Sequence, residues 1–372
     1  MTMGRLQSGF FGMTVRRAVY DYLRAVGLIL FILLAVAWTI DLARHFPSLR
    51  AAAMSREDTL LGLLAPYLLH RGADIVARLL PMACLFGVLL AEIMRRRRLE
   101  SVILEAAGFS TLRKLAALLW LALILGTLQG MLESRWRPAA VFAQIESGFG
   151  NYAGRYRREW QRTPVWFVGD ARAVKAEVRR TDDPELRNLL IFEGIREPRL
   201  TRVLSAARGF PLQKPLHWRL EDIQIWNVDA EGSPPTAVAS MEMQLDLIPE
   251  QISYYGIQEF NIPSPTLGAL ATRLDAPNAA AIQTAVWRRQ TAWLLPGAFA
   301  LLAAAMAQLV FEGRQLMVPR LIVLAGLGYV AVVSVKVMWA LGELGTLPAP
   351  AAVLLPVLVA VLLAVGLSRR RI

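Results

Sequence analysis

The side chains that could do chemistry in this sequence are cations placed within or beside apolar stretches. Lys336 lies inside the apolar run from 321 to about 341, away from its ends. An ammonium there is costly in lipid, so it should face a cavity or a partner, and a phosphorylated headgroup would suit it. Arg71, Asp74 and Arg78 interrupt a second apolar run at spacings of i, i+3 and i+7. That spacing places the three charges on one helix face, which must look into protein, a wet cavity or the outer interface.

Each of these charges also has a simpler interpretation. Lys336 could snorkel to the outer interface if its span ends early. Arg44, Arg71 and Arg78 lie toward the outer ends of two apolar runs, where they could either ring the same cavity or anchor the helices at the interface. Asp74 could simply neutralise its arginine neighbours. Spacing alone leaves both interpretations open.

A second group of charges surrounds a short amphipathic segment. Arg95 to Arg98 open the stretch 94–115, and an apolar stripe at i, i+3, i+4 and i+7 follows: Leu99, Val102, Ile103 and Ala106. Gly108 then suits a left-handed helix stop. A short charged helix between two apolar spans predicts docking into a groove of another protein. The alternative is a solvated hairpin whose arginines only fix topology.

Composition indicates a membrane protein without a catalytic or metal centre. The chain is 55% hydrophobic with a mean hydropathy of +0.42. Its net charge is +12, yet residues 138–287 carry 16 Lys and Arg against 18 Asp and Glu, so the basic surplus belongs to the apolar parts and argues against nucleic-acid binding. The one cysteine, Cys84, lies in an apolar run, and the three histidines lack metal-ligand spacing. No nucleophile elbow or H-E-x-x-H pattern occurs, so we expect no catalytic residue, metal or cofactor.

The apolar runs and the polar middle predict three parts. The fold class expected is a membrane α-helical protein of six transmembrane helices with an inserted, exported all-β domain resembling a jelly roll. The N-terminal half is 1–137, with spans near 23–44, 66–93 and 112–134; the β domain is 138–275; the C-terminal half is 276–372, with spans near 290–311, 320–342 and 348–368. Short strands are expected at 165–168, 171–178, 188–193, 218–228 and 240–247. The arginine distribution places both termini and Arg95 to Arg98 in the cytoplasm.

This plan and several local strings resemble the lipopolysaccharide-export permease family of LptF/LptG type. The string LLPMACLFGVLLAEIMRRRRLESVILEAAGFS, from Leu79 to Ser110, looks like that family's second span and cytoplasmic coupling helix. RLTRVLSAARGFPLQKPLHWRLEDIQIW resembles its periplasmic domain, and GELGTLPAPAAVLLPVLVAVLLAVGLSRRR its last span. The string IDLARHF, with Asp41, leans toward the LptG-like member.

The resemblance implies a permease subunit of an inner-membrane ABC exporter rather than an enzyme. Its partners would be a homologous permease, a cytoplasmic ABC ATPase dimer, a periplasmic bridge protein and lipopolysaccharide. ATP hydrolysis would come from the ATPase, since the chain has no phosphate-binding loop. The coupling helix would be 98–108, with the ATPase-coupling residues Arg98, Glu100, Val102, Ile103, Leu104 and Gly108. The lipid-binding residues would be Lys336, Arg44, Arg71 and Arg78.

Two other functions fit parts of the pattern. A membrane-anchored sensor would use the exported β domain to bind a ligand, but the cytoplasmic parts are loops without an output domain. A lipoprotein-release-type permease usually carries its exported domain after the first span, whereas this polar region follows the third. A copurifying ATPase would separate a permease from a sensor.

Overall fold

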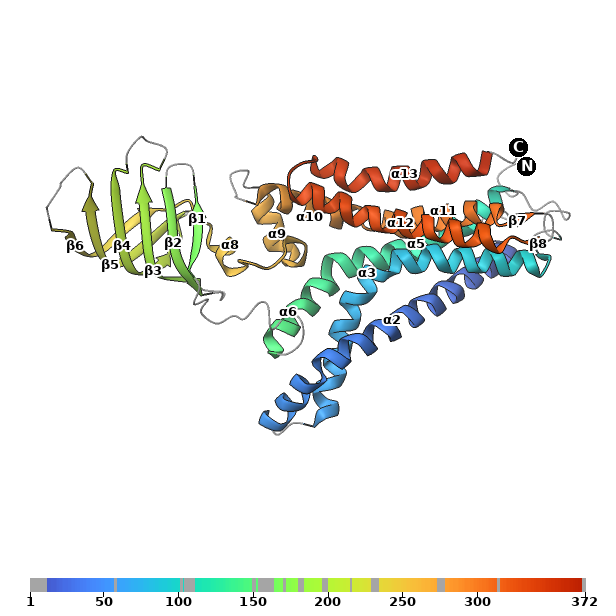
Figure 1. The fold of residues 1–372 in the computed structure, drawn as a ribbon, viewed down its shortest axis with the longest axis horizontal. Helices are drawn as coiled ribbons and strands as arrows, with labels where there is room; N and C mark the ends of the chain where they lie inside the picture. The colour runs from blue at the N-terminus through green and yellow to red at the C-terminus, as the bar shows by residue number, and fades with distance from the viewer. Residues whose placement is uncertain are drawn as a thin grey trace. The chain divides into compact units, whose positions relative to one another are not determined.

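The residue contacts of this protein divide it into two compact units (Figure 1). One, called here the membrane unit, contains the residues up to Phe142, Glu259–Ser264 and those from Ala280 onward. The other, the β unit, contains Ala143–Gln258 and Pro265–Ala279. The computed structural model describes residues 12–56, 59–100, 103, 111–148, 152, 164–169, 172–179, 184–195, 200–214, 216–228, 234–272, 278–312 and 315–369.

The first half of the membrane unit consists of helices longer than the apolar runs in the sequence. They are α2 Met13–Arg56, α3 Leu60–Arg97, α5 Thr111–Met131, the π-helical turn η1 Leu132–Trp136, and α6 Arg137–Ser147. The 44 residues of α2 extend ~66 Å, about twice the apolar thickness of a bilayer. Thr59 caps α3 by accepting a hydrogen bond from the Gly62 N–H at 3.2 Å.

The second half contains a bent helix pair, a short hairpin and two straight helices. They are α10 Ala279–Thr291, α11 Leu294–Leu309, β7 Phe311–Glu312, β8 Gln315–Leu316, α12 Val318–Glu343 and α13 Ala349–Arg369. Helices α10 and α11 meet at 62°. Gly126 of α5 packs at this bend, where a Cβ would lie 2.5 Å from the carbonyl oxygen of Trp293. Because α11 has only 16 residues, the fourth expected span needs part of α10 to reach across a bilayer.

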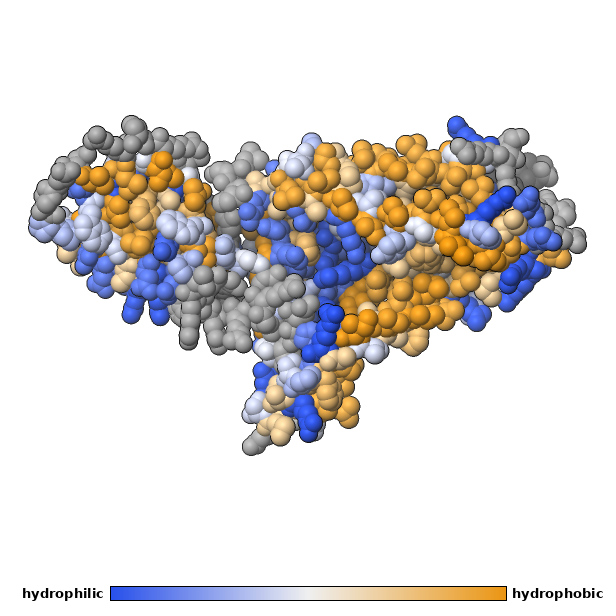
Figure 2. Space-filling view, in the orientation of Figure 1, coloured by the Kyte–Doolittle hydropathy of each residue, from blue (hydrophilic) through white to orange (hydrophobic). Residues whose placement is uncertain are grey.

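The described helices suit a membrane. Five are long and apolar enough to cross one, and six if the bent pair counts as a single span. Within the membrane unit, apolar side chains form a broad band, and hydrophilic side chains gather toward its ends (Figure 2). The hairpin β7–β8 lies at the same end as the last residues of α3 and α13 (Figure 1). The predicted fold class, a helical membrane protein with an inserted β domain, is confirmed.

Helix α3 is the centre of the membrane unit. It packs against α2, α11 and α12, and Leu80, Leu85 and Val88 on it are fully buried. Its approach to α2 depends on Gly87, where a Cβ would lie 2.5 Å from the Cα of Val26. Small residues at such crossings let backbones approach closely in membranes, where the hydrophobic effect does not hold helices together.

We expect Gly87→Ala to destabilise the membrane unit by about 1–3 kcal/mol, because the added methyl group would force α2 and α3 apart. The matched control is Gly27→Ala on α2, where a Cβ meets nothing within 4 Å and alanine favours the helix. Thermal unfolding in mild detergent measures both. Equal melting temperatures for the two variants would contradict the close packing at Gly87.

The β unit contains one six-stranded antiparallel sheet. Its strands are β1 Val165–Val168, β2 Arg172–Arg179, β3 Glu185–Glu193, β4 Arg202–Pro211, β5 His217–Asn227 and β6 Thr236–Gln244. The strands pair in sequential order, so each strand neighbours the next one along the chain. The register places Trp218 opposite Pro211 on one side and Met243 on the other. This order was not predictable from the strand patterns alone.

One face of the sheet is buried. Alternate residues form it, among them Val174, Ile191, Leu204 and Trp218. The indole of Trp218 is fully buried and donates to the carbonyl oxygen of Leu247 at 3.0 Å. The expected alternation after residue 240 is present: Met243, Leu245 and Leu247 are buried, while Glu242 and Gln244 are exposed. Three short helices follow the sheet: α8 Pro249–Ser253, η2 Glu259–Asn261 and α9 Ser264–Ala271.

Candidate functional site

A chain of ion pairs begins between α2 and α3. The carboxylate of Asp41 accepts hydrogen bonds from the Tyr67 hydroxyl at 2.5 Å and from Arg71 Nε at 2.9 Å. Arg71 also pairs with Asp74 at 2.9 Å. Asp41 is 7% exposed and Asp74 is 0% exposed, so these charges are removed from solvent. Of the predicted shared face, Arg71 and Asp74 therefore point into protein, whereas Arg78 is exposed.

The ion pairs continue from α3 to α6 and α10. Asp74 pairs with Arg78 and with Arg137, each at 2.9 Å. Arg137 also pairs with Glu133 at 3.0 Å, and Glu133 pairs with Arg288 at 2.9 Å. We call this set the charge network: Asp41, Arg71, Asp74, Arg78, Glu133, Arg137 and Arg288. Its four arginines exceed its three carboxylates, so the network retains a positive charge.

Glu133 lies in the π-helical turn η1, one turn before Arg137. The N–H of Arg137 donates to the carbonyl of Leu132, five residues earlier, which widens the helix locally. Single π-helical turns are frequent at functional sites. Here the turn positions the carboxylate of Glu133, which is 2% exposed, so that it contacts Arg137 of α6 and Arg288 of α10.

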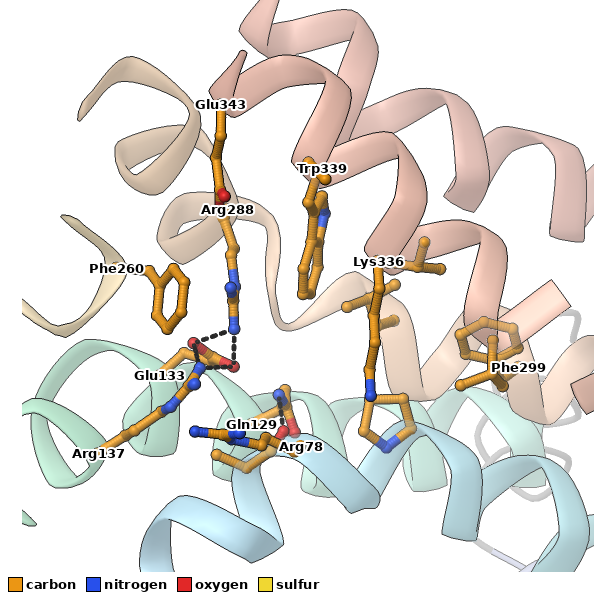
Figure 3. A pocket seen from close by; sticks show the side chains of 16 residues that line it. Arg78, Gln129, Glu133, Arg137, Phe260, Arg288, Phe299, Lys336, Trp339 and Glu343 are labelled. Atoms are coloured by element: carbon orange, nitrogen blue, oxygen red, sulfur yellow. Dashed lines mark hydrogen bonds and ion pairs between the residues drawn. The ribbon is translucent and has the colours of Figure 1, made fainter. Parts of the chain in front are cut away.

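Arg288 is held by aromatic rings as well as by Glu133. Its guanidinium lies 4.5 Å from the ring centroid of Phe260 and 4.0 Å from that of Trp339 (Figure 3). A cation against an aromatic face is stabilised by the ring quadrupole. The neighbouring Arg289 donates to the carbonyl oxygens of Phe260, at 3.0 Å, and of Ile262. These two arginines therefore fix the segment Glu259–Ser264 to α10.

A pocket of about 230 Å³ opens beside the network (Figure 3). One part of its lining is charged, with four cations against two carboxylates: Arg78, Arg137, Arg288, Lys336, Glu133 and Glu343. The rest is mostly apolar: Ala77, Pro81, Leu295, Phe299, Val332, Val335, Trp339, Phe260 and Ala340, with Gln129 among them. We call it the cationic pocket. Its lining suits an anionic group attached to an apolar one.

Lys336 differs from the three arginines of this pocket, each of which pairs with a carboxylate. It extends from α12 across the pocket toward α3 (Figure 3), and among the described residues it makes no hydrogen bond or ion pair. Three further polar atoms of pocket-lining residues are buried without a hydrogen-bond partner in the described part of the chain: Gln129 Oε1, Arg288 Nε and Trp339 Nε1. An unpaired buried donor or acceptor is costly, so the pocket has unused capacity to bind a polar ligand.

The structure brings together only some of the residues expected to bind lipid. Lys336 and Arg78 line the cationic pocket. Arg71 lies in the charge network, where Asp41 and Asp74 neutralise it. Arg44 is exposed on α2 and does not line the pocket.

Three of the residues expected to couple to an ATPase are described, and they follow the arginine-rich end of α3: Arg98, Glu100 and Ile103. Arg95 Nη1 donates to the Tyr22 hydroxyl at 3.1 Å, and Arg96 donates to the carbonyl of Gln308 at 3.3 Å, so these two arginines hold neighbouring helices. Arg98 is exposed in the turn that follows α3.

The helix after this turn begins later than the sequence predicts. Leu99 has a left-handed φ of 58°, and its carbonyl accepts the N–H of Ile103 at 3.0 Å. Helical backbone therefore starts at Glu100 rather than at Arg98. Ile103 is 64% exposed. The other coupling candidates, Val102, Leu104 and Gly108, lie outside the described residues.

Sequence reasoning missed Glu133, Arg137 and Arg288. The signal was present: Glu133 and Arg137 are spaced i, i+4 at the end of an apolar run, and Arg288 lies four residues before another, which begins at Ala292. Their mutual contacts were not predictable, because 155 residues separate Glu133 from Arg288. Charges at both ends of a long polar insertion are therefore candidates for pairing with each other.

Comparison with known families identifies the chain. Residues 19–370 match the family model described as lipopolysaccharide export system permease LptF/LptG. The match includes every residue of the charge network and the cationic pocket, but it does not separate the LptF-like from the LptG-like member. A comparison with curated protein sequences finds no match. Because the family model covers nearly the whole chain, this protein belongs to the lipopolysaccharide export permeases of the LptF/LptG family, which are inner-membrane transporter subunits.

Proposed function

We propose that the chain is one of two related permease subunits that extract lipopolysaccharide from the inner membrane, and that the cationic pocket receives an anionic part of this lipid. The observation that carries the proposal is the unpaired Lys336 beside an excess of arginines and next to an apolar wall. A phosphate on a lipid anchor has the matching chemistry, since ammonium and guanidinium groups form strong charge-assisted hydrogen bonds with phosphate.

The four cations that the sequence analysis expected to bind lipid have different roles in this proposal. Lys336 supplies a point charge that pairs with no carboxylate among the residues that the structure describes. Arg78 pairs with Asp74 through Nε at 3.0 Å and Nη2 at 2.9 Å, and its side chain, 41% exposed, lines the pocket together with Lys336. Arg71 orders the network instead, and Arg44 anchors α2 at the interface.

The transport cycle would be driven by partner subunits. A cytoplasmic ATPase dimer would dock on the stretch that includes Arg98, Glu100 and Ile103, together with Val102, Leu104 and Gly108. Support comes from the exposure of Ile103, an aliphatic side chain in an arginine-rich region. The β domain, proposed as 138–275, would pass the lipid to a periplasmic bridge protein. The LptG-like identity rests on the string IDLARHF and stays a prediction.

We expect a reporter fused near Trp218 to give a periplasmic signal, and reporters at both termini to give cytoplasmic signals. The reason is the arginine excess at one end of the membrane unit, because basic loops stay in the cytoplasm. Paired alkaline phosphatase and fluorescent-protein fusions measure the orientation. A cytoplasmic signal near Trp218 would remove the proposed hand-over to a bridge protein.

We expect Lys336→Glu to reduce lipopolysaccharide crosslinking and export about tenfold or more, because it replaces an attraction for phosphate with a repulsion. The measurement is crosslinking from a photoreactive residue placed at Val332, which also lines the pocket. Lys336→Arg keeps the charge and should retain most of the signal. Recovery of each variant with its partner subunits shows whether assembly is intact.

Normal crosslinking and growth in a correctly assembled Lys336→Glu variant would contradict the proposal. Lys336 would then belong with Arg44 among the residues that anchor helices. Loss of crosslinking together with loss of assembly would also count against a specific lipid contact, since it would assign Lys336 to the packing of the subunits.

A further inference from the structure

A second cleft, of about 420 Å³, lies between α2 and α3 at the arginine-rich end of the membrane unit. Its charged lining is Asp21, Arg24, Arg95, Arg98 and Glu100, and its apolar lining is Ala25, Leu28, Leu90, Ala91 and Met94. The charge network and the cationic pocket share no residue with it.

The three arginines of this cleft are not equivalent. Arg95 is 8% exposed and is held by the Tyr22 hydroxyl at 3.1 Å and by Glu92 at 3.5 Å. Arg24 and Arg98 are exposed, and neither forms an ion pair within the described part of the chain. Arg24 lies 5.5 Å from the ring centroid of Tyr20, which leaves its donors open. The cleft therefore has one arginine, Arg95, that is held in place by protein contacts, and two exposed arginines that can bind an anionic ligand.

Along both α2 and α3, the apolar residues of the cleft follow its charged residues toward the middle of the helix. On α2, Leu28 lies one turn beyond Arg24, and it is 53% exposed. On α3, Met94 lies one turn before Arg98 and Leu90 lies two turns before it. A ligand that fits this order has an anionic group at the end of the helices and an apolar chain pointing toward their middle.

We propose that this cleft binds the phosphodiester of an anionic phospholipid, such as phosphatidylglycerol, between Arg24 and Arg98, with its acyl chains along Leu28 and Leu90. Basic pockets between transmembrane helices on the cytoplasmic side of a membrane bind anionic lipid headgroups. The lining carries three arginines against two carboxylates, which favours a singly charged phosphodiester. The assignment of this lipid to the cytoplasmic leaflet rests on the membrane orientation given under the proposed function; the rest of the proposal does not.

The site has a consequence for the neighbouring turn. Arg98 and Glu100 lie on either side of Leu99, where α3 ends and the next helix begins. A headgroup held by Arg98 would contact this turn directly. The lipid would therefore order the start of the stretch that we expect to meet the ATPase.

The test is lipid-dependent thermal stabilisation of the full-length chain, purified in mild detergent with whatever subunits accompany it. Phosphatidylglycerol, phosphatidylcholine and inorganic phosphate are titrated separately. We expect phosphatidylglycerol to stabilise the wild type at the lowest concentration. Arg24→Gln should raise its half-saturating concentration about fivefold, as expected for one basic residue near an anionic headgroup. Arg17→Gln is the matched control, because Arg17 is also exposed on α2 but does not line the cleft.

Three results would overturn the proposal: equal stabilisation by phosphatidylcholine, equal stabilisation by inorganic phosphate, or the same response in Arg24→Gln and Arg17→Gln. Native mass spectrometry of retained phosphatidylglycerol gives a second readout that does not depend on melting behaviour. Neither measurement involves lipopolysaccharide, so failure here leaves the proposed export function untouched, and failure of lipopolysaccharide crosslinking leaves this site untouched.

Discussion

Replacing Asp74 with asparagine is expected to destabilise the membrane unit by about 3–5 kcal/mol, the cost of breaking a buried ion pair from one side. Asp74 is 0% exposed and pairs with Arg71, Arg78 and Arg137. Asparagine has nearly the same shape but no charge, so the surrounding arginines would be left undercompensated. Thermal unfolding in detergent, together with the yield of folded protein, measures the loss.

Glu312→Gln is the matched control for this variant. Glu312 pairs with Arg320 at 3.1 Å, but both side chains are more than half exposed. An exposed pair contributes about 1 kcal/mol or less. If Asp74→Asn and Glu312→Gln lower stability equally, the charge network is not a structural element. Adding Arg78→Gln to Asp74→Asn should recover part of the loss, because it removes one undercompensated cation.

Replacing Ile103 with aspartate is expected to weaken retention of the ATPase about 10- to 100-fold. Burying an aliphatic side chain at an interface is worth ~1.5–3 kcal/mol, and a buried aspartate would add a desolvation cost. Ile103 is 64% exposed in the isolated chain, so the substitution should change folding stability little. The measurement is the amount of ATPase that copurifies, followed by lipid-dependent ATP turnover in reconstituted complexes.

The control is Met13→Asp, which places the same charge at the start of α2, where Met13 is 87% exposed. Neither variant changes Arg95 to Arg98, so a pure topology signal would be intact in both. Normal ATPase retention by Ile103→Asp would assign this stretch to topology alone, since the apolar side chain would then have no partner.

Local pattern predicted the fold well because each element carries its own signal. The period-2 alternation that ends in Met243 and Leu245 identified a strand, and long uncharged runs identified the helices. The strand β4 is absent from the expected strands because alanine and glycine hold some of its inward positions, as at Ala206 and Gly209, and both are weak strand formers. The strand order depends on pairing between segments, which no local pattern carries.

The site was predictable only where its residues are near in sequence. The shared face of Arg71, Asp74 and Arg78 follows from helical spacing, and the structure confirms that Asp74 neutralises its neighbours. Lys336 was recognisable as a charge in an apolar run. Glu133 and Arg288 were not paired in advance, because their contact depends on the π-helical turn and on the bend before α11. Contacts across the polar insertion therefore need the three-dimensional fold.

The continuous helix formed by α5, η1 and α6 has a mechanical consequence. It runs over the 34 residues Lys114–Ser147, ~50 Å, and follows the expected docking stretch in the chain. Ion pairs to Asp74 and Arg288 hold it beyond its midpoint, at Glu133 and Arg137. Helix α5 also packs along α11, so this part of the continuous helix is held at several points, and a rigid element of this kind carries a displacement that a loop would absorb. A small shift at its start, near Lys114, would therefore reach Glu133 and Arg137 and, through them, the charge network.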